Sequence, residues 1–296
     1  MPNEDGTNIN YEAVDFLRNL NEALRTTHEG FLTIAEESTA YPKVTSDVDD
    51  PEGLGFVYKW NMGYMHDTLY YMELDPLYRK DNHGAIIFSM DYAYSENYIL
   101  PYSHDEVVHG KKTIVDKIWG TYEEKFKQLR TLYLYMFTHP GKKLNFMGNE
   151  LAHFREWDET KECDWTLLNY PIHDAFNRYF ARLGKLYTSI PALYENDYDW
   201  QSFEWIDADN ADQNLFSYMR KSEQGIYIVI LNFSPNRYDA HAFGVPMKGV
   251  YHEILNTESE MYGGNVHELK KYKSVKEECN AKEQSIRCLL YTSDAA

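Results

Sequence analysis

The sequence of 296 residues is poor in cysteine and in positive charge. Its three cysteines, Cys163, Cys279 and Cys288, are odd in number and share no metal-ligand spacing. This pattern argues against a disulfide framework and a zinc site, and favours a reducing, cytoplasmic setting. The 29 basic and 47 acidic residues give a formal net charge of -18, whereas a nucleic acid or an anionic membrane attracts a positive surface. We therefore expect neither of these partners.

Other signals are missing as well. No apolar run approaches the roughly 20 residues of a membrane-spanning helix, and the polar opening MPNEDGTNIN lacks the plan of a signal peptide. The sequence has no Gly-rich phosphate loop and no nucleophile elbow. Aromatic residues are abundant, with 26 Tyr, 14 Phe and 6 Trp, and hydrophobic residues make up 43%. The composition predicts a soluble globular protein of about two domains.

Short apolar runs alternate with helical patterns through the first two thirds of the chain. The runs FLTIAEES, GLGFVYKWNMGYM, NYILPYSHD and KKLNFMGNE are predicted strands, and the first is predicted to be buried on both faces. Helices are predicted over about residues 11–25, behind the capping box of Thr121 and Glu124, and in DAFNRYFARLGKLYTSI. Such alternation indicates a parallel sheet whose strand ends all point to one face.

The pattern changes after about residue 195. Short alternating runs, NLFSYMR, GIYIVILNF, HAFGV and YHEILN, are separated there by Ser, Asn, Pro and Gly. This pattern of short alternating runs predicts a separate antiparallel β domain. The sequence contains no low-complexity linker, so we expect the two domains to pack closely.

Carboxylates follow two of the predicted parallel strands. Glu36 comes after the first strand, and Asp105 comes after the third. The carboxyl ends of parallel strands are where α/β barrels keep their reactive groups. Two carboxylates that face each other across a cleft are the minimum for cleaving a glycosidic bond, because one must hold a proton for the leaving oxygen and the other must meet a cationic sugar. His104 would add a neutral donor for sugar hydroxyls.

The same residues also have structural interpretations. A Glu after an apolar run is usually the first solvated residue beyond a strand, and a single His is more often structural than catalytic. Glu150, Glu156 and Asp158 either line the mouth of a site or face water. Aromatic side chains fill cores more often than they stack on sugars. The aromatic candidates for sugar stacking are Trp60, Tyr64, Trp157 and Trp165.

Several blocks, taken in order, resemble the bacterial glycogen branching enzymes of the α-amylase superfamily. They are FLTIAEEST, GFVYKWNMGYMHDTLYYM, LPYSHDEVVHGKK, HPGKKLNFMGNE and REWDETKECDW, and the resemblance runs from about residue 2 to residue 287. It implies that residues 1–194 form the second half of a (β/α)8 TIM barrel, about strands 5 to 8. It also implies that residues 195–287 form a C-terminal β-sandwich domain.

The resemblance further implies a glycosyltransferase of glycogen biosynthesis. Such an enzyme cleaves α-1,4-glucan chains and transfers them to a 6-hydroxyl, which forms α-1,6 branches by a retaining double displacement. Glu36 in AEES looks like the general acid/base, and Asp105 in SHD looks like the carboxylate that stabilises the transition state. His104 looks like a substrate-binding neighbour, and Trp60 is a further substrate-binding candidate. The implied partner is an α-glucan such as glycogen or an amylose-like chain, with no metal or organic cofactor.

The chain departs from the family pattern at both ends. The family's nucleophilic aspartate lies in an Arg-x-Asp motif on the fourth strand, and no such motif precedes the helix predicted over residues 11–25. We therefore expect that the nucleophile and the first half of the barrel are absent from this chain, and that it is inactive alone. The final residues CLLYTSDAA resemble the translation of a transposon adaptor used in DNA sequencing, so residues 288–296 are expected to be a non-native tail.

Two alternative functions stay open. An α-amylase-type glucan hydrolase would share the two carboxylates, and product analysis would separate it from a branching enzyme. A non-catalytic glucan-binding fragment would use the aromatic residues and the β domain instead. In either case we expect half a barrel to expose strand edges and a large apolar face.

Overall fold

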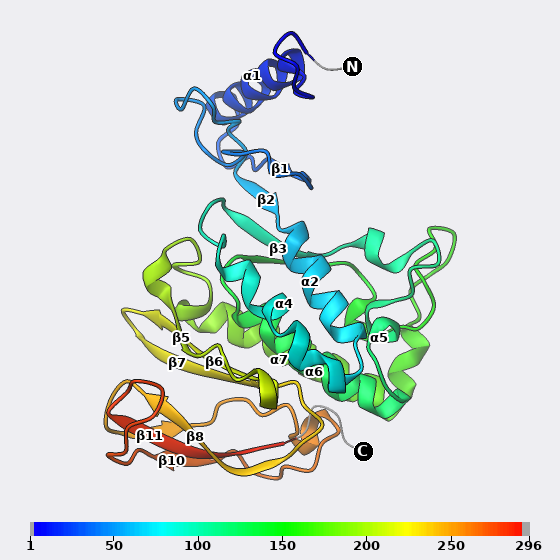
Figure 1. Ribbon diagram of the computed structural model, residues 1–296. Coiled ribbons are helices and arrows are strands. Elements are labelled where there is room, and N and C mark those ends of the chain that lie inside the picture. Colours follow the sequence, from blue (N-terminus) through cyan, green and yellow to red (C-terminus); the bar gives the residue numbers. More distant parts are fainter. Residues whose placement is uncertain (1–2, 292–296) are drawn as a thin grey trace.

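The structure, a computed structural model that describes residues 3–291, consists of a parallel α/β part followed by antiparallel β sheets (Figure 1). Four parallel strands lie side by side in chain order, and each is joined to the next through a helical crossover or a longer loop. The predicted fold class, a parallel α/β part with an antiparallel all-β domain, is confirmed. The parallel strands are β1 (Ile34–Ala35), β2 (Tyr58–Trp60), β3 (Tyr98–Tyr102) and β4 (Lys142–Asn145).

Four long helices accompany this sheet. The Asn10 side chain caps the first by accepting a hydrogen bond from the Ala13 N–H, and the predicted capping box of Thr121 and Glu124 begins the third. The apolar side of that third helix is buried in the main core, because Phe126, Leu129 and Leu132 recur at helical spacing. The long helices are α1 (Tyr11–Thr27), α2 (Met62–Glu73), α6 (Tyr122–Thr138) and α7 (Pro171–Ser189), and the short ones are α3 (Pro76–Arg79), α4 (Gly84–Ile87) and α5 (Ile114–Lys117).

The C-terminal part contains strands that, among the described residues, all pair antiparallel, apart from one isolated parallel bridge between Ser259 and Val266. Its first sheet has the order β5-β6-β7, and two further pairs are β8 with β11 and β9 with β10. The strands are β5 (Phe203–Asp207), β6 (Leu215–Ser222), β7 (Gly225–Asn232), β8 (Tyr238–Val245), β9 (Val250–His252), β10 (Lys271–Lys273) and β11 (Gln284–Leu290). The domain boundary at residues 194 and 195 stays a prediction. β11 includes the first three residues of the segment 288–296, whose non-native origin also stays a prediction, and residues 292–296 lie outside the described residues.

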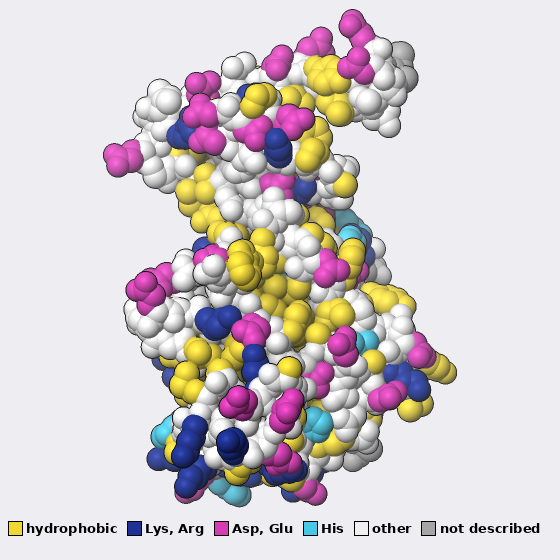
Figure 2. All heavy atoms as spheres, turned by 60° about the vertical axis from the view of Figure 1, so that its left-hand side comes forward, with side chains coloured by type: hydrophobic (Ala, Val, Ile, Leu, Met, Phe, Trp, Pro, Cys, Tyr) yellow, Lys and Arg dark blue, Asp and Glu magenta, His cyan; other side chains and the backbone are white. Residues whose placement is uncertain are grey.

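α1 and β1 project from the rest of the molecule as an N-terminal arm (Figure 1). The prediction that FLTIAEES forms a strand buried on both faces is wrong: only Ile34 and Ala35 pair, and Phe31, Leu32 and Ile34 are 55%, 56% and 44% exposed. The reason is that β1 is an edge strand, paired with β2 on one side and, within the described residues, with no strand on the other. Apolar side chains are accordingly visible at the surface where the arm meets the rest of the molecule (Figure 2).

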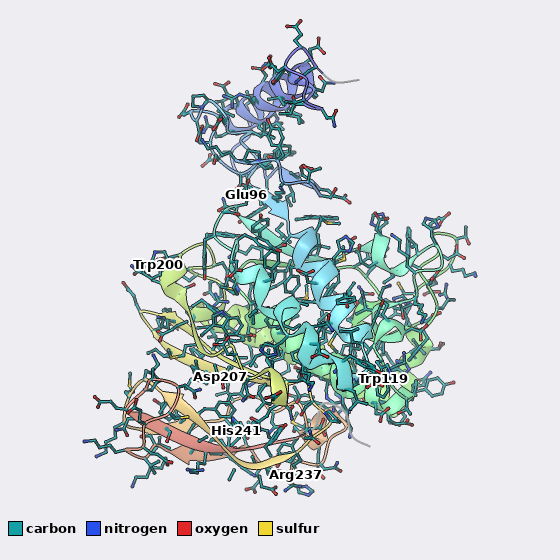
Figure 3. All side chains as sticks on the ribbon, in the orientation of Figure 1. Glu96, Trp119, Trp200, Asp207, Arg237 and His241 are labelled. Carbon is teal, nitrogen blue, oxygen red and sulfur yellow. The ribbon has the colours of Figure 1, made fainter. Side chains whose placement is uncertain are left out.

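A buried carboxylate ties the loop between β1 and β2 to the segment before β3. Glu96, which lies where the arm joins the sheet (Figure 3), is 8% exposed. It accepts hydrogen bonds from the N–H groups of Val44 and Thr45, each at 2.8 Å. Because a buried carboxylate needs such donors, these hydrogen bonds hold the loop against the segment before β3.

Ion pairs and a hydrogen bond to the backbone join the β domain to the α/β part. Arg220 of β6 and Asp197 are both fully buried, and their Nη2 and Oδ1 atoms are 2.9 Å apart. Arg220 also donates from Nη1 to the carbonyl of Thr138 at the end of α6, at 2.7 Å. Lys142 of β4 donates to the second oxygen of Asp197 at 3.1 Å. Asp197 therefore compensates two cations that come from different parts of the fold.

We expect Asp197→Ala to destabilise the protein by about 3–5 kcal/mol, because it leaves the buried Arg220 guanidinium without its countercharge. Urea unfolding followed by circular dichroism measures the change. The control is Asp239→Ala, which removes the exposed pair with Arg237 and should cost less than about 1 kcal/mol. Equal losses in the two variants would contradict this account of the domain contact.

Candidate functional site

The carboxyl ends of the parallel strands bring the predicted site residues to one edge of the sheet. Glu36 follows β1 directly, and His104 and Asp105 lie in a short 3-10 helix that begins two residues after β3. β2 separates β1 from β3, so the two carboxylates come from strands about 10 Å apart. Trp60 is the last residue of β2 and lies between them in the strand order.

The strand register also separates the two carboxylates along the strand direction. The pairing of β1, β2 and β3 sets Glu36 level with Trp60 and Ile99. β3 continues three residues further, to Tyr102, which is about 10 Å. Stagger of this kind accompanies the tilt of strands in a barrel.

The candidate side chains are open to solvent. Glu36 is exposed, and its carboxylate has no hydrogen-bond partner among the described residues. The side chains of His104 and Asp105 are 45% and 49% exposed, and Nε2 of His104 lies 3.3 Å from Oδ1 of Asp105. All three groups are therefore accessible to a ligand at this edge.

Two neighbouring carboxylates after β3 have opposite environments. Glu106 is buried, and one of its oxygens accepts hydrogen bonds from the Ser103 N–H at 2.9 Å and the Ser103 hydroxyl at 2.7 Å. This capping box fixes the first turn after the strand. Because Glu106 is turned inward, Asp105 is left on the solvent side of the turn.

The far end of the same loop is held by Glu156. Gly110 and Lys112 have positive φ angles of 79° and 66°, a conformation that costs energy for a lysine. Their N–H groups donate to the two carboxylate oxygens of Glu156 at 2.9 and 2.7 Å. These two backbone hydrogen bonds lower the pKa of Glu156 below its usual value. The next residue, Trp157, donates its N–H to the carbonyl of Val107 at 3.0 Å.

Aromatic rings fix the His104 side chain. Its ring centroid lies 5.8 Å from Phe146, which follows β4, and 6.2 Å from Trp157. Phe146 and Trp157 contact each other edge to face at 5.2 Å. Each contact of this type contributes about 0.5–1.5 kcal/mol. Trp157 therefore orients His104, a role that the list of candidate stacking residues did not anticipate.

The other aromatic candidates differ in how far they are buried. Tyr64 is fully buried, with its ring packed against Tyr102, Tyr135 and His139, so the suggestion that it stacks on a sugar is wrong. The helical spacing of Tyr64 with the apolar face of α2 is the signal that could have shown this. Trp165 is exposed. Two more exposed tryptophans, Trp119 and Trp200, lie far from each other on the molecule (Figure 3).

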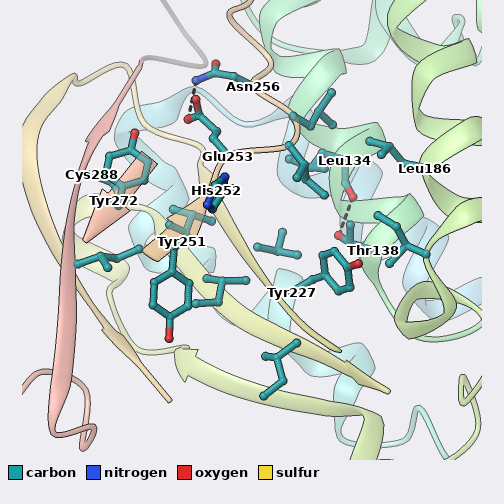
Figure 4. Close-up of a pocket in the computed structure, with 18 of the residues that line it drawn as sticks. Leu134, Thr138, Leu186, Tyr227, Tyr251, His252, Glu253, Asn256, Tyr272 and Cys288 are labelled. Carbon is teal, nitrogen blue, oxygen red and sulfur yellow. Dashed lines mark hydrogen bonds between the residues drawn. The ribbon is translucent and has the colours of Figure 1, made fainter. Parts of the chain in front are cut away.

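No described group of three or more His, Cys, Asp or Glu side chains is arranged to hold a metal ion. None of the helices in the described part of the chain combines the length and hydrophobicity that a membrane-spanning helix requires. A cavity of about 880 Å³ lies between α6, α7 and the β domain (Figure 4), and Glu36, Trp60, His104 and Asp105 are not among the residues that line it.

A family model and two solved structures are similar to this chain. Residues 205–294 match the family model "Alpha amylase, C-terminal all-beta domain". The whole fold is similar to a type I pullulanase from Bacillus subtilis, with a TM-score of 0.63 and 15% identity, over 94% of this chain and 42% of that one. An Anoxybacillus α-amylase gives a TM-score of 0.57 and 13% identity, over 95% of this chain and 54% of that one. The fold is therefore similar to part of the fold of these two enzymes.

Sequence similarity is more specific. A 1,4-α-glucan branching enzyme from Clostridium perfringens is 49% identical over 268 residues, which are 90% of this chain and 40% of the relative. The branching enzyme from Geobacillus stearothermophilus is 49% identical over 89% of this chain and 41% of its own length. The chain is a homologue of the 1,4-α-glucan branching enzymes, and it spans about two fifths of the length of the curated relatives it matches.

We expect Glu156→Ala to loosen the loop that follows β3, because the amides of Gly110 and Lys112 lose their acceptor. Hydrogen exchange at these two amides, measured by NMR, should become at least about fivefold faster than in the unaltered chain. Glu159→Ala removes an exposed carboxylate nearby and is the matched control, with no change expected at either amide. Unchanged exchange in the Glu156 variant would show that the two hydrogen bonds do not restrain the loop.

Proposed function

We propose that this chain contributes the acid/base part of an active site that forms α-1,6 branches in α-glucan. The observation that carries the proposal is the placement of Glu36 and Asp105 at one edge of a parallel sheet, in a chain homologous to branching enzymes over 90% of its length. The four candidate residues are Glu36 as general acid/base, Asp105 as the transition-state stabiliser, and His104 and Trp60 as substrate-binding residues.

The chemistry follows from the protonation states that the two carboxylates need. Glu36 gives its proton to the glycosidic oxygen that leaves, and later takes a proton from the attacking 6-hydroxyl of the acceptor glucan. Asp105 stays ionised and stabilises the positive charge that develops on the sugar ring. His104, held by Phe146 and Trp157, donates a hydrogen bond to a sugar hydroxyl.

The covalent step needs a third carboxylate about 5 Å from the acid. No Arg-x-Asp motif that could supply it precedes α1 in this sequence. We therefore propose that the chain by itself is inactive and that the nucleophile comes from the part of the enzyme that precedes this region. Transfer in place of hydrolysis requires the acceptor hydroxyl to outcompete water, so a complete, closed cleft is needed as well.

The free state of all three cysteines fits a cytoplasmic enzyme.

The test is a chimera that joins this chain to the part of the Clostridium perfringens relative outside the matched region. With amylose as substrate, we expect new α-1,6 linkages, measured as chains released by a debranching enzyme. The unfused chain should give none. Reducing ends without branches would identify an α-amylase-type hydrolase and overturn the proposal, and binding of maltoheptaose without any turnover would favour a glucan-binding role.

Within this chimera, Glu36→Gln should lower the branching rate by at least about 100-fold, the lower end of what general acid/base catalysis contributes. The control is Glu29→Gln, which changes an exposed carboxylate in the loop before β1 and should leave the rate within about twofold. Full activity of the Glu36 variant would remove this residue from the mechanism.

A further inference from the structure

One side of the strand β7 faces a cavity and not another strand. β7 is the last strand in the sheet order β5-β6-β7. Almost every residue from Ser222 to Asn232 lines the cavity of about 880 Å³, together with residues of α6, α7, β9 and β11 (Figure 4). An edge strand eight residues long is therefore left open along the β domain.

The hairpin register identifies the backbone groups that face this cavity. Ser222 pairs with Gly225 across a two-residue loop, a closing pair that exchanges two hydrogen bonds. Hydrogen-bonded pairs then alternate along the ladder, so the odd-numbered residues of β7 bond to β6. The N–H and C=O groups of Ile226, Ile228 and Ile230 point away from β6. Among the described residues, none of these six groups has a hydrogen-bond partner.

Apolar walls cover both faces of the space beside β7. Helices α6 and α7 form one wall, and strands β9 and β11 form the other. A strand placed here would be buried on both faces, as the strands of covered parallel sheets are, and would need apolar side chains on both. The wall residues include Leu134, Leu186 and Ile190 on the helical side, and Val250, Tyr251 and Ile286 on the strand side.

The charged residues that line the cavity do not require a charged ligand. Glu223 and Lys248 are exposed. The Glu253 carboxylate already accepts hydrogen bonds from the Asn256 side chain at 3.1 Å and from the Lys270 N–H at 2.9 Å. Glu253 therefore already has donors within the chain and needs none from a ligand.

We propose that this cavity binds one extended peptide segment of a partner polypeptide, which pairs with β7 as an added strand. The six free backbone groups are one N–H and one C=O on every second residue of β7, and these residues lie about 6.8 Å apart along the strand. An added strand presents its own N–H and C=O groups at the same spacing. A lipid chain would leave all of them without partners, and the hydroxyls of a glucan would lie against aliphatic walls. The proposal therefore specifies an uncharged segment of about eight residues that is rich in branched aliphatic side chains. It does not depend on the glucan chemistry proposed above.

The experiment uses a fluorescein-labelled peptide of alternating valine and isoleucine, eight residues long, with two lysines at each end for solubility. Fluorescence anisotropy with the full chain should give saturable binding. The same peptide with every second backbone amide N-methylated cannot complete the strand pairing, and should bind at least about tenfold more weakly. Equal binding of both peptides would show only a general apolar site and would overturn the proposal. So would an unchanged anisotropy of the unmodified peptide with the protein in about 100-fold excess over it.

Variants of the chain give a second readout. Ile228→Pro removes an N–H that faces the cavity while keeping the ladder to β6, and should weaken binding of the unmodified peptide at least about tenfold. Asp239→Ala changes an exposed side chain that does not line the cavity, and should leave binding within about twofold. Circular dichroism confirms that each variant is folded. Unchanged binding by a folded Ile228 variant would contradict the pairing with β7.

Discussion

The common direction of four parallel strands is the constraint on which the rest of this structure depends. Because β1, β2, β3 and β4 run the same way and lie in chain order, every segment that follows a strand emerges at the same edge of the sheet. Residues 69 positions apart in the sequence, Glu36 and Asp105, reach that edge for this reason alone. An antiparallel arrangement of the same strands would send neighbouring strand ends to opposite sides.

The candidate site residues lie in loops at this edge of the sheet, so the site requires these loops to be rigid. Carboxylates that take no part in the proposed reaction hold the loops in place by hydrogen bonds. Glu106 is buried and caps the turn after β3, Glu156 holds the amides at the far end of the same loop, and Glu96 fixes the loop after β1. Asp197 plays the same part at the contact with the β domain. Each carboxylate accepts donors that would otherwise lack partners, so the exposed Asp105 is presented by a rigid frame.

The sequence allowed the parallel strands, the helices α1, α6 and α7 and the change to an antiparallel domain to be predicted, because periodicity and capping are local signals. The run GLGFVYKWNMGYM forms a strand only over Tyr58–Trp60, and its last residues begin α2. The prediction failed for β1, since burial of Phe31 and Leu32 depends on what lies beyond the edge of the sheet, and a residue's own neighbours do not reveal that. The clamp formed by Glu156 and Trp157 was missed for a related reason: its contacts with Gly110 and Val107 join segments more than 40 residues apart. Tyr64 was misjudged because an aromatic ring that fills a core and one that meets a sugar look alike in sequence.

The central claim is that Glu36 and Asp105 face one glucan-binding cleft. A crystal structure of the completed enzyme with a bound malto-oligosaccharide tests it directly. The account predicts a single glycosidic linkage with its oxygen within about 3 Å of a Glu36 oxygen, and a hydroxyl of the adjoining ring within the same distance of Asp105. A bound chain that contacts only one of the two carboxylates, or neither, would contradict it.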